Sequence, residues 1–106
     1  MGFQENLSKL PSIEHLVGLD VRDQKEHVLL HIPAAPGKLG SLKIYHALSL
    51  QFNQTLNPNS AAHGLSLFAE HVDAAVAHPG QHPNIDFLQK VIAENLQLSL
   101  HPIVRA

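Results

Sequence analysis

Residues Ile13–Ile32 read IEHLVGLDVRDQKEHVLLHI, and this stretch predicts a β-hairpin. Apart from His15, the odd positions from 13 to 21 are apolar, as are the even positions from 28 to 32, which is the period of half-buried strands. If Arg22 pairs with His27 across the turn, both apolar sets lie on one face. A slip by one residue would destroy that match. The predicted cross-strand pairs are Val21 with Val28, Leu19 with Leu30, and Val17 with Ile32.

The segments on either side of the hairpin predict helices and one more strand. Apolar side chains at helical spacing indicate a short N-terminal helix ending before Pro11, a helix over 41–52, a long helix over 60–77, and a helix that Asn84 caps. Alternating residues over 96–101 indicate a strand that Pro102 stops. The expected fold is α+β: a small antiparallel sheet of about three strands, hairpin plus C-terminal strand, packed on three or four helices. Which hairpin strand the last strand joins stays open.

Composition sets the class of protein. The chain has 106 residues, 44% of them hydrophobic and 15% charged, which predicts a single domain over residues 1–106 with a buried core. With no cysteine, the sequence excludes disulfides, thiolate metal sites and cysteine nucleophiles. Nine histidines are the unusual feature of the composition.

Charge and hydropathy exclude two kinds of partner. The net charge is −2 and no three basic residues are adjacent, so we expect no nucleic-acid binding. No apolar run approaches the ~18 residues of a membrane span, and the first residues do not resemble a signal peptide. We therefore expect no membrane association and a cytoplasmic location.

The segment 69–86 reads AEHVDAAVAHPGQHPNID and is rich in side chains that bind metals. Imidazole and carboxylate groups together suit a divalent transition metal such as zinc, nickel, manganese or iron. For a compact site, the turn at Pro79–Gly80 would have to bring His82 and Asp86 back against the preceding helix. The candidate metal ligands are Glu70, His71, His78, His82 and Asp86.

A structural role fits the same segment, and it is the interpretation we favour from sequence. Glu70 and Asp73 then form a solvated helix face, and His82 and Asn84 satisfy backbone groups at the next helix start. No His-Glu-x-x-His motif is present, so one helix does not present two imidazoles as it does in zinc proteases.

A second candidate site is the loop 36–41, PGKLGS, before the helix predicted over 41–52. Glycines expose backbone N–H groups and a helix N-terminus favours anions, so Lys38, Gly40 and Ser41 are candidate anion-binding residues. The loop is not a nucleotide-binding P-loop, which needs G-x-x-x-x-G-K-[ST]. Alternatively, Ser41 simply caps the helix.

The two blocks together resemble a known family. PGKLGSL leading to Tyr45–His46, and AEH leading through Asp73–Ala74 to PGQHPNID, are similar to a family of small proteobacterial proteins known as a domain of unknown function. The resemblance covers nearly the whole chain and implies a stand-alone bacterial domain, but no mechanism. A basic residue is usual after the final Asp of the second block, where this chain has Phe87.

These observations predict a small non-catalytic binding or protein-interaction domain, because no complete catalytic constellation is found and no serine lies in a G-x-S-x-G motif. Apolar residues on the outer sheet face, such as Leu16 and Leu29, suggest a homo-oligomer or a protein partner. The alternative is a metal-binding protein, which includes a metal-dependent enzyme, that uses the cluster of residues 70–86, with Glu70 as acid or base.

Overall fold

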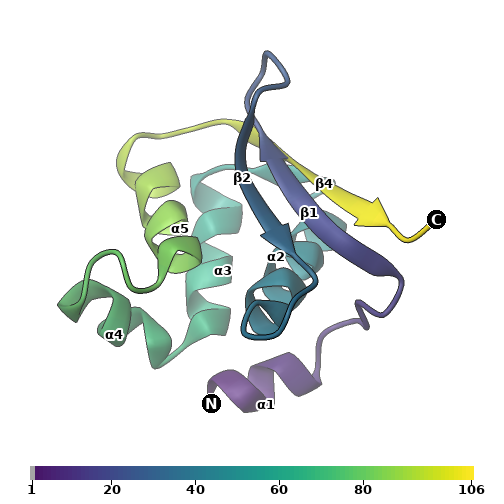
Figure 1. Cartoon of the computed structure of the whole chain (residues 1–106). Coiled ribbons are helices and arrows are strands. Elements are labelled where there is room, and N and C mark those ends of the chain that lie inside the picture. Colours follow the sequence, from purple (N-terminus) through teal and green to yellow (C-terminus); the bar gives the residue numbers. More distant parts are fainter. Residues whose placement is uncertain (1) are drawn as a thin grey trace.

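A computed structural model describes residues 2–106, and its centre is one four-stranded antiparallel sheet. The strands are β1 (Leu16–Arg22), β2 (Val28–Pro33), β3 (Thr55–Leu56) and β4 (Leu98–Val104), in the spatial order β2-β1-β4-β3. The α+β class and the hairpin are confirmed, but the sheet has one strand more than the predicted three. The C-terminal strand joins β1, so β1 and β4 are the two central strands (Figure 1).

The register of the hairpin differs from the predicted one by two residues. Val21 lies opposite Leu30 and Leu19 opposite Ile32, with an irregularity between Val21 and Arg22. The cause is a longer turn, because an Asp23 carboxylate oxygen accepts the N–H groups of Lys25 and His27, both at 2.9 Å. His27 therefore belongs to the turn and does not pair with Arg22, which faces Val28.

A second irregularity lies at the start of β1. The predicted core residue Val17 is 42% exposed, while Leu16, predicted on the outer face, is buried. The register with β4 shifts between Leu16 and Gly18, so Val17 is an extra residue on β1. Such a bulge reverses the alternation of faces, which the simple period of two cannot anticipate.

Five helices within residues 2–106 gather on one side of the sheet (Figure 1). They are α1 (Phe3–Ser8), α2 (Leu39–Gln51), α3 (Pro58–Phe68), α4 (His71–Ala77) and α5 (Pro83–Ala93). None of these helices is long and apolar enough to cross a membrane.

The core lies between the sheet and helices α2, α3 and α5. Close packing there requires glycine at position 64, because a Cβ atom would lie 2.9 Å from both Leu48 Cδ1 and Leu88 Cδ1. The helices thus meet at van der Waals distance, and their starts and ends are fixed relative to one another.

The helix predicted over 60–77 is two helices, and the prediction of one is wrong. Ala69 interrupts the predicted helix with φ 53° and ψ −122°, a backbone conformation that residues other than glycine rarely adopt. Helix α1 compensates the interruption, because the Asn6 side-chain amide donates to the Leu67 carbonyl at 3.1 Å. No breaker residue marks this position in the sequence, so the break comes from tertiary contacts.

Two strand predictions also need correction. The connection between the helices predicted over 41–52 and 60–77, for which no strand was predicted, contains β3, which pairs with Leu98 and Ser99 of β4. Strand β4 continues past Pro102 to Val104. The Leu100 N–H points away from β1 and donates to the Gln54 carbonyl at 2.8 Å. Pro102, two residues on, directs its ring nitrogen to the same side, beyond the end of β3, so no ladder bond is lost there.

The helix starts differ from the predicted caps. Helix α2 begins at Leu39, so Ser41 lies in its first turn and Lys38 is at the N-cap position. Helix α5 begins at Pro83 with His82 at the N-cap position, and Asn84 is inside the helix. Neither start is capped by a side chain. Both starts, and the side chains near them, border the pocket described next.

Candidate functional site

A pocket of about 360 Å³ lies where α1, the start of α2, the end of α3 and the start of α5 meet. This volume is at the lower end of the range for small-molecule sites. Both of the sequence blocks identified above contribute lining residues. The fold thus brings residues 37–41 and residues 81–85 to one pocket. The lining residues are Phe3, Gln4, Leu7, Gly37, Lys38, Leu39, Gly40, Ser41, Phe68, His71, Gln81, His82, Pro83, Asn84 and Ile85.

The first wall is the loop that leads into α2. Gly37 has φ 83°, which glycine adopts without strain, and this turn places Lys38 at the helix start. All three candidate anion-binding residues, Lys38, Gly40 and Ser41, line the pocket. Within residues 2–106, no carboxylate pairs with the Lys38 ammonium group.

The second wall is the turn between α4 and α5. Gly80 has φ 93°, and its N–H donates to Asp86 Oδ2 at 2.9 Å, which fastens the turn to the first turn of α5. This arrangement brings His82 beside His71, with 6.2 Å between the ring centroids. The Asp86 carboxylate thus holds the backbone in place.

Helix α1 forms the third wall through Phe3. The Phe3 ring stacks on Phe68 at a centroid distance of 6.1 Å and meets the His71 ring edge-on at 4.5 Å. A Cβ atom on Gly40 would lie 2.8 Å from Phe3 Cζ, so the glycine lets the ring lie against α2. Phe3 and Phe68 were not predicted as site residues, because in the sequence both are ordinary apolar positions of a helix.

Glu70 anchors the start of α1 from outside the pocket. Its Oε1 atom accepts the Phe3 N–H at 2.9 Å. Hydrogen bonds from its own backbone N–H and from the Phe3 N–H lower the pKa of the Glu70 carboxyl. The carboxylate is therefore charged at neutral pH and occupied by the backbone of α1.

Asn84 lines the pocket and is only 8% exposed. Its backbone carbonyl accepts a hydrogen bond from the buried Tyr45 hydroxyl at 2.6 Å. Its side-chain amide has no hydrogen-bond partner among the described residues. The only signal for Asn84 in the sequence was its place before a helix, which suggested a cap.

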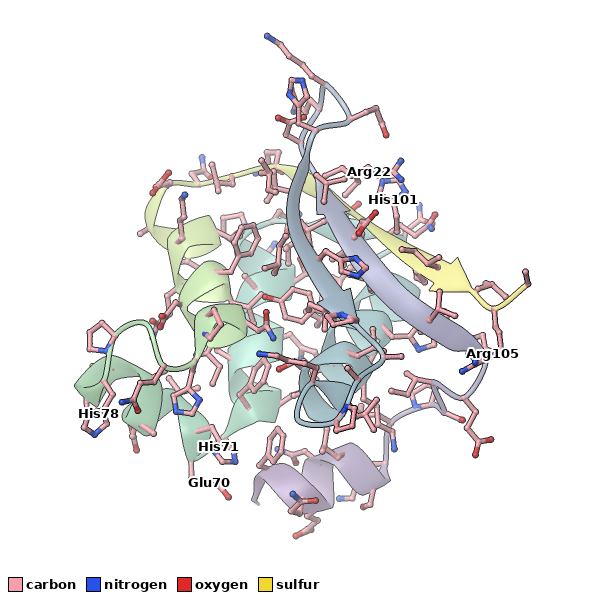
Figure 2. All side chains as sticks on the ribbon, in the orientation of Figure 1. Arg22, Glu70, His71, His78, His101 and Arg105 are labelled. Carbon is pink, nitrogen blue, oxygen red and sulfur yellow. The ribbon has the colours of Figure 1, made fainter. Side chains whose placement is uncertain are left out.

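The structure separates the candidate metal ligands. His71 and His82 are neighbours, but Glu70 and Asp86 bond to backbone N–H groups. His78 lies at the far end of α4 from His71 and projects outward (Figure 2). In the part of the chain from Gly2 to Ala106, no group of three or more histidine, aspartate or glutamate side chains is arranged to hold a metal ion.

A second polar cluster lies on the outer face of the sheet, where Figure 2 labels Arg22 and His101. Asp20 is bonded to His31 Nδ1 at 2.7 Å and lies 3.9 Å from the Arg22 guanidinium group. A hydrogen bond of 2.7 Å joins Ser99 Oγ to His101 Nε2. These groups mainly satisfy one another, whereas the polar side chains that line the pocket have no hydrogen-bond partner among residues 2–106.

Fold and pocket together define a small α+β protein whose helices enclose a cavity of ligand size on one side of an antiparallel sheet. Residues 3–102 match the family model described as "Uncharacterized protein conserved in bacteria (DUF2322)", and the chain belongs to this family. The resemblance noted from the two blocks is thereby confirmed at the level of the family. Neither the curated proteins nor the solved structures contain a match to the chain.

Proposed function

We propose that the chain is a small, non-catalytic binding domain that holds a small molecule in the pocket between α1, α2 and α5. The observation that supports this function is the convergence of the two distinctive sequence blocks on one cavity. Apolar walls with a few polar groups that lack protein partners are typical of ligand sites. The lining contains His71, His82 and Lys38 but no Asp or Glu. A binding role needs no further catalytic group, so it is the function that we propose.

The test is a screen of small-molecule fragments by two-dimensional NMR on ¹⁵N-labelled protein. We expect the shifts that fragments cause to gather on residues that line the pocket, such as Lys38, His82 and Ile85. Gln81→Trp, which places a large ring at the pocket, should abolish these shifts. Gln51→Trp, at the opposite end of α2, is the matched control and should leave them unchanged. Shifts that map to the sheet, or no binding at all, would reject the function.

Metal binding is the second candidate, and the proximity of His71 and His82 favours it. Two imidazoles can hold a divalent transition metal if oxygen atoms of a ligand complete its coordination. Elemental analysis of tag-free protein and melting scans with and without a chelator test this candidate. We expect stoichiometric metal that is lost in His71→Ala and His82→Ala and retained in His78→Ala. Protein without metal and without a chelator effect would reject it.

A further inference from the structure

The unpaired side chain of Asn84 indicates what the ligand must provide. Its amide atoms are not sealed from solvent, so the pocket gives a ligand access to them. Asn84 is 8% exposed, lines the pocket and has no side-chain partner among residues 2–106. Its backbone N–H lies in the first turn of α5, where no helical carbonyl can accept it. A ligand with a strong acceptor would satisfy both donors.

The charges around Asn84 favour a negative ligand. The Lys38 ammonium group has no ion-pair partner within the described chain, and His71 and His82 add two imidazoles. No carboxylate is among the lining residues, and the Glu70 carboxylate, which interacts with His71 from outside the pocket, is hydrogen-bonded to the Phe3 N–H. An anion placed here would accept charge-assisted hydrogen bonds from these groups. Such bonds are stronger than hydrogen bonds between two neutral groups.

Two helix starts reinforce this preference. Helices α2 and α5, of 13 and 11 residues, both begin at the pocket, and neither has a side-chain cap. Helix α3 begins elsewhere and has a complete capping box from Asn57 and Ser60. The free N–H groups of the two uncapped starts supply donors and partial positive charge to the cavity.

We infer that the ligand is a small organic anion. Its carboxylate or phosphate group lies among Lys38, His82 and Asn84, and its apolar part lies against Phe3 and Phe68. This inference rests on the proposed function, since it specifies the ligand class for the same pocket.

The experiment compares four probes by NMR titration at neutral pH and low salt: phenyl phosphate, phenylacetate, inorganic phosphate and the uncharged benzyl alcohol. We expect at least one aromatic anion to bind about tenfold or more tightly than benzyl alcohol, which corresponds to ~1.4 kcal/mol. Inorganic phosphate should bind more weakly than phenyl phosphate, because it cannot use the apolar wall. Comparison of the two aromatic anions identifies the preferred head group.

Two variants test the placement of the anion. Asn84→Asp changes one atom of the side chain and puts a negative charge in the pocket, so it should weaken anion binding about tenfold or more while benzyl alcohol is unaffected. Asn95→Asp makes the same charge change at an exposed site beyond α5 and is the matched control. If Asn84→Asp fails to fold, Lys38→Ala gives the same test, with the exposed Lys90→Ala as its control.

The outcomes separate this inference from the proposed function. Equal affinity for benzyl alcohol and both aromatic anions, all mapping to the pocket, would overturn the anion and leave the binding function intact. Loss of anion binding in both Asn84→Asp and Asn95→Asp would also overturn the placement, because a general charge effect would explain it. Inorganic phosphate binding as tightly as phenyl phosphate would overturn the role of Phe3 and Phe68.

Discussion

His46 is 5% exposed in α2, and its Nδ1 atom has no hydrogen-bond partner among the described residues. Its ring meets the ring of His15 edge-on, at a centroid distance of 5.4 Å. Burial, and to a lesser extent the neighbouring His15, lower the pKa of His46 below the ordinary value of 6.5. The folded protein therefore keeps this imidazole neutral at a pH where the unfolded chain would protonate it.

We expect His46 to make the protein less stable in weak acid. Because the unfolded chain binds the proton more readily, the free energy of unfolding should fall as the pH drops below 6.5, until the folded imidazole is also protonated. His46→Gln should show a smaller fall in urea unfolding measured from pH 7.5 to 5. The exposed His78→Gln is the control and should keep the wild-type slope; equal slopes in both variants would contradict the prediction.

Ala69 is a second residue that lowers the stability of the fold, through its strained backbone conformation. Its φ of 53° and ψ of −122° match the first central residue of a type II′ turn, where glycine is normal. Such strain costs of order 1–3 kcal/mol for a residue with a side chain.

Ala69→Gly should therefore stabilise the protein, although it adds flexibility to the unfolded chain. The strain removed exceeds the ~0.4–1 kcal/mol of added chain entropy, so we expect a net gain of about 1 kcal/mol in urea unfolding. Ala74→Gly, in the middle of α4, has no strain to relieve and should lose ~0.5–1 kcal/mol. A loss of similar size in both variants would show that Ala69 is not strained.

At the scale of elements, one hydrogen bond connects α2 to the start of α5. The Tyr45 hydroxyl is fully buried and donates to the Asn84 carbonyl. Burial raises the pKa of Tyr45 well above 10, so the hydroxyl keeps its proton at any ordinary pH. The bond joins two of the three walls of the pocket.

Tyr45→Phe should leave the Asn84 carbonyl buried without a partner. We expect a loss of about 1–3 kcal/mol in the free energy of unfolding. The NMR signals of Asn84 and Ile85 should shift, because the start of α5 is no longer held against α2. A change below about 0.5 kcal/mol, the lower end for one hydrogen bond, would mean that another donor or water replaces the hydroxyl.

At the scale of the whole molecule, β2 forms one edge of the sheet and carries exposed apolar side chains. Val28 and Leu29 are 51% and 45% exposed, and among the described residues 2–106 only β1 pairs with β2. An apolar edge strand favours pairing with another strand, which supports the homo-oligomer expected from the sequence.

Sedimentation at increasing protein concentration measures this association. We expect a mass above the 11.6 kDa of one chain, and Leu29→Lys should restore the monomer. Leu50→Lys, at a 59% exposed position on α2, is the control and should leave the association unchanged. A monomer at the highest concentration would reject the prediction.

The sequence predicted the elements that have a clear period. The hairpin, α2 and α5 were expected within a few residues of their observed bounds. The break at Ala69 was not predictable, since α1 supplies the compensating contact from a distant part of the chain. Strand β3 was missed because two residues carry no period, and it exists only where β4 provides a partner.

The pocket was predictable in parts but not as a whole. Lys38, Gly40, Ser41, His71 and His82 were all identified, yet as two separate candidate sites. Their union depends on how α2 and α5 pack against α3, and spacing within one segment carries no information about that packing. For the same reason, the sequence could not show that Glu70 and Asp86 are used by the backbone.

The pairing of β1 with β4 also has a consequence for the order in which the chain acquires its structure. Val21 and Leu100 are partners, so all of α2 to α5 is looped out between them. During synthesis on the ribosome, the second edge of β1 stays without its neighbour until the β4 segment has emerged. The β1–β4 contact joins residues that are far apart in the sequence, and such pairings form slowly because a long loop must close first.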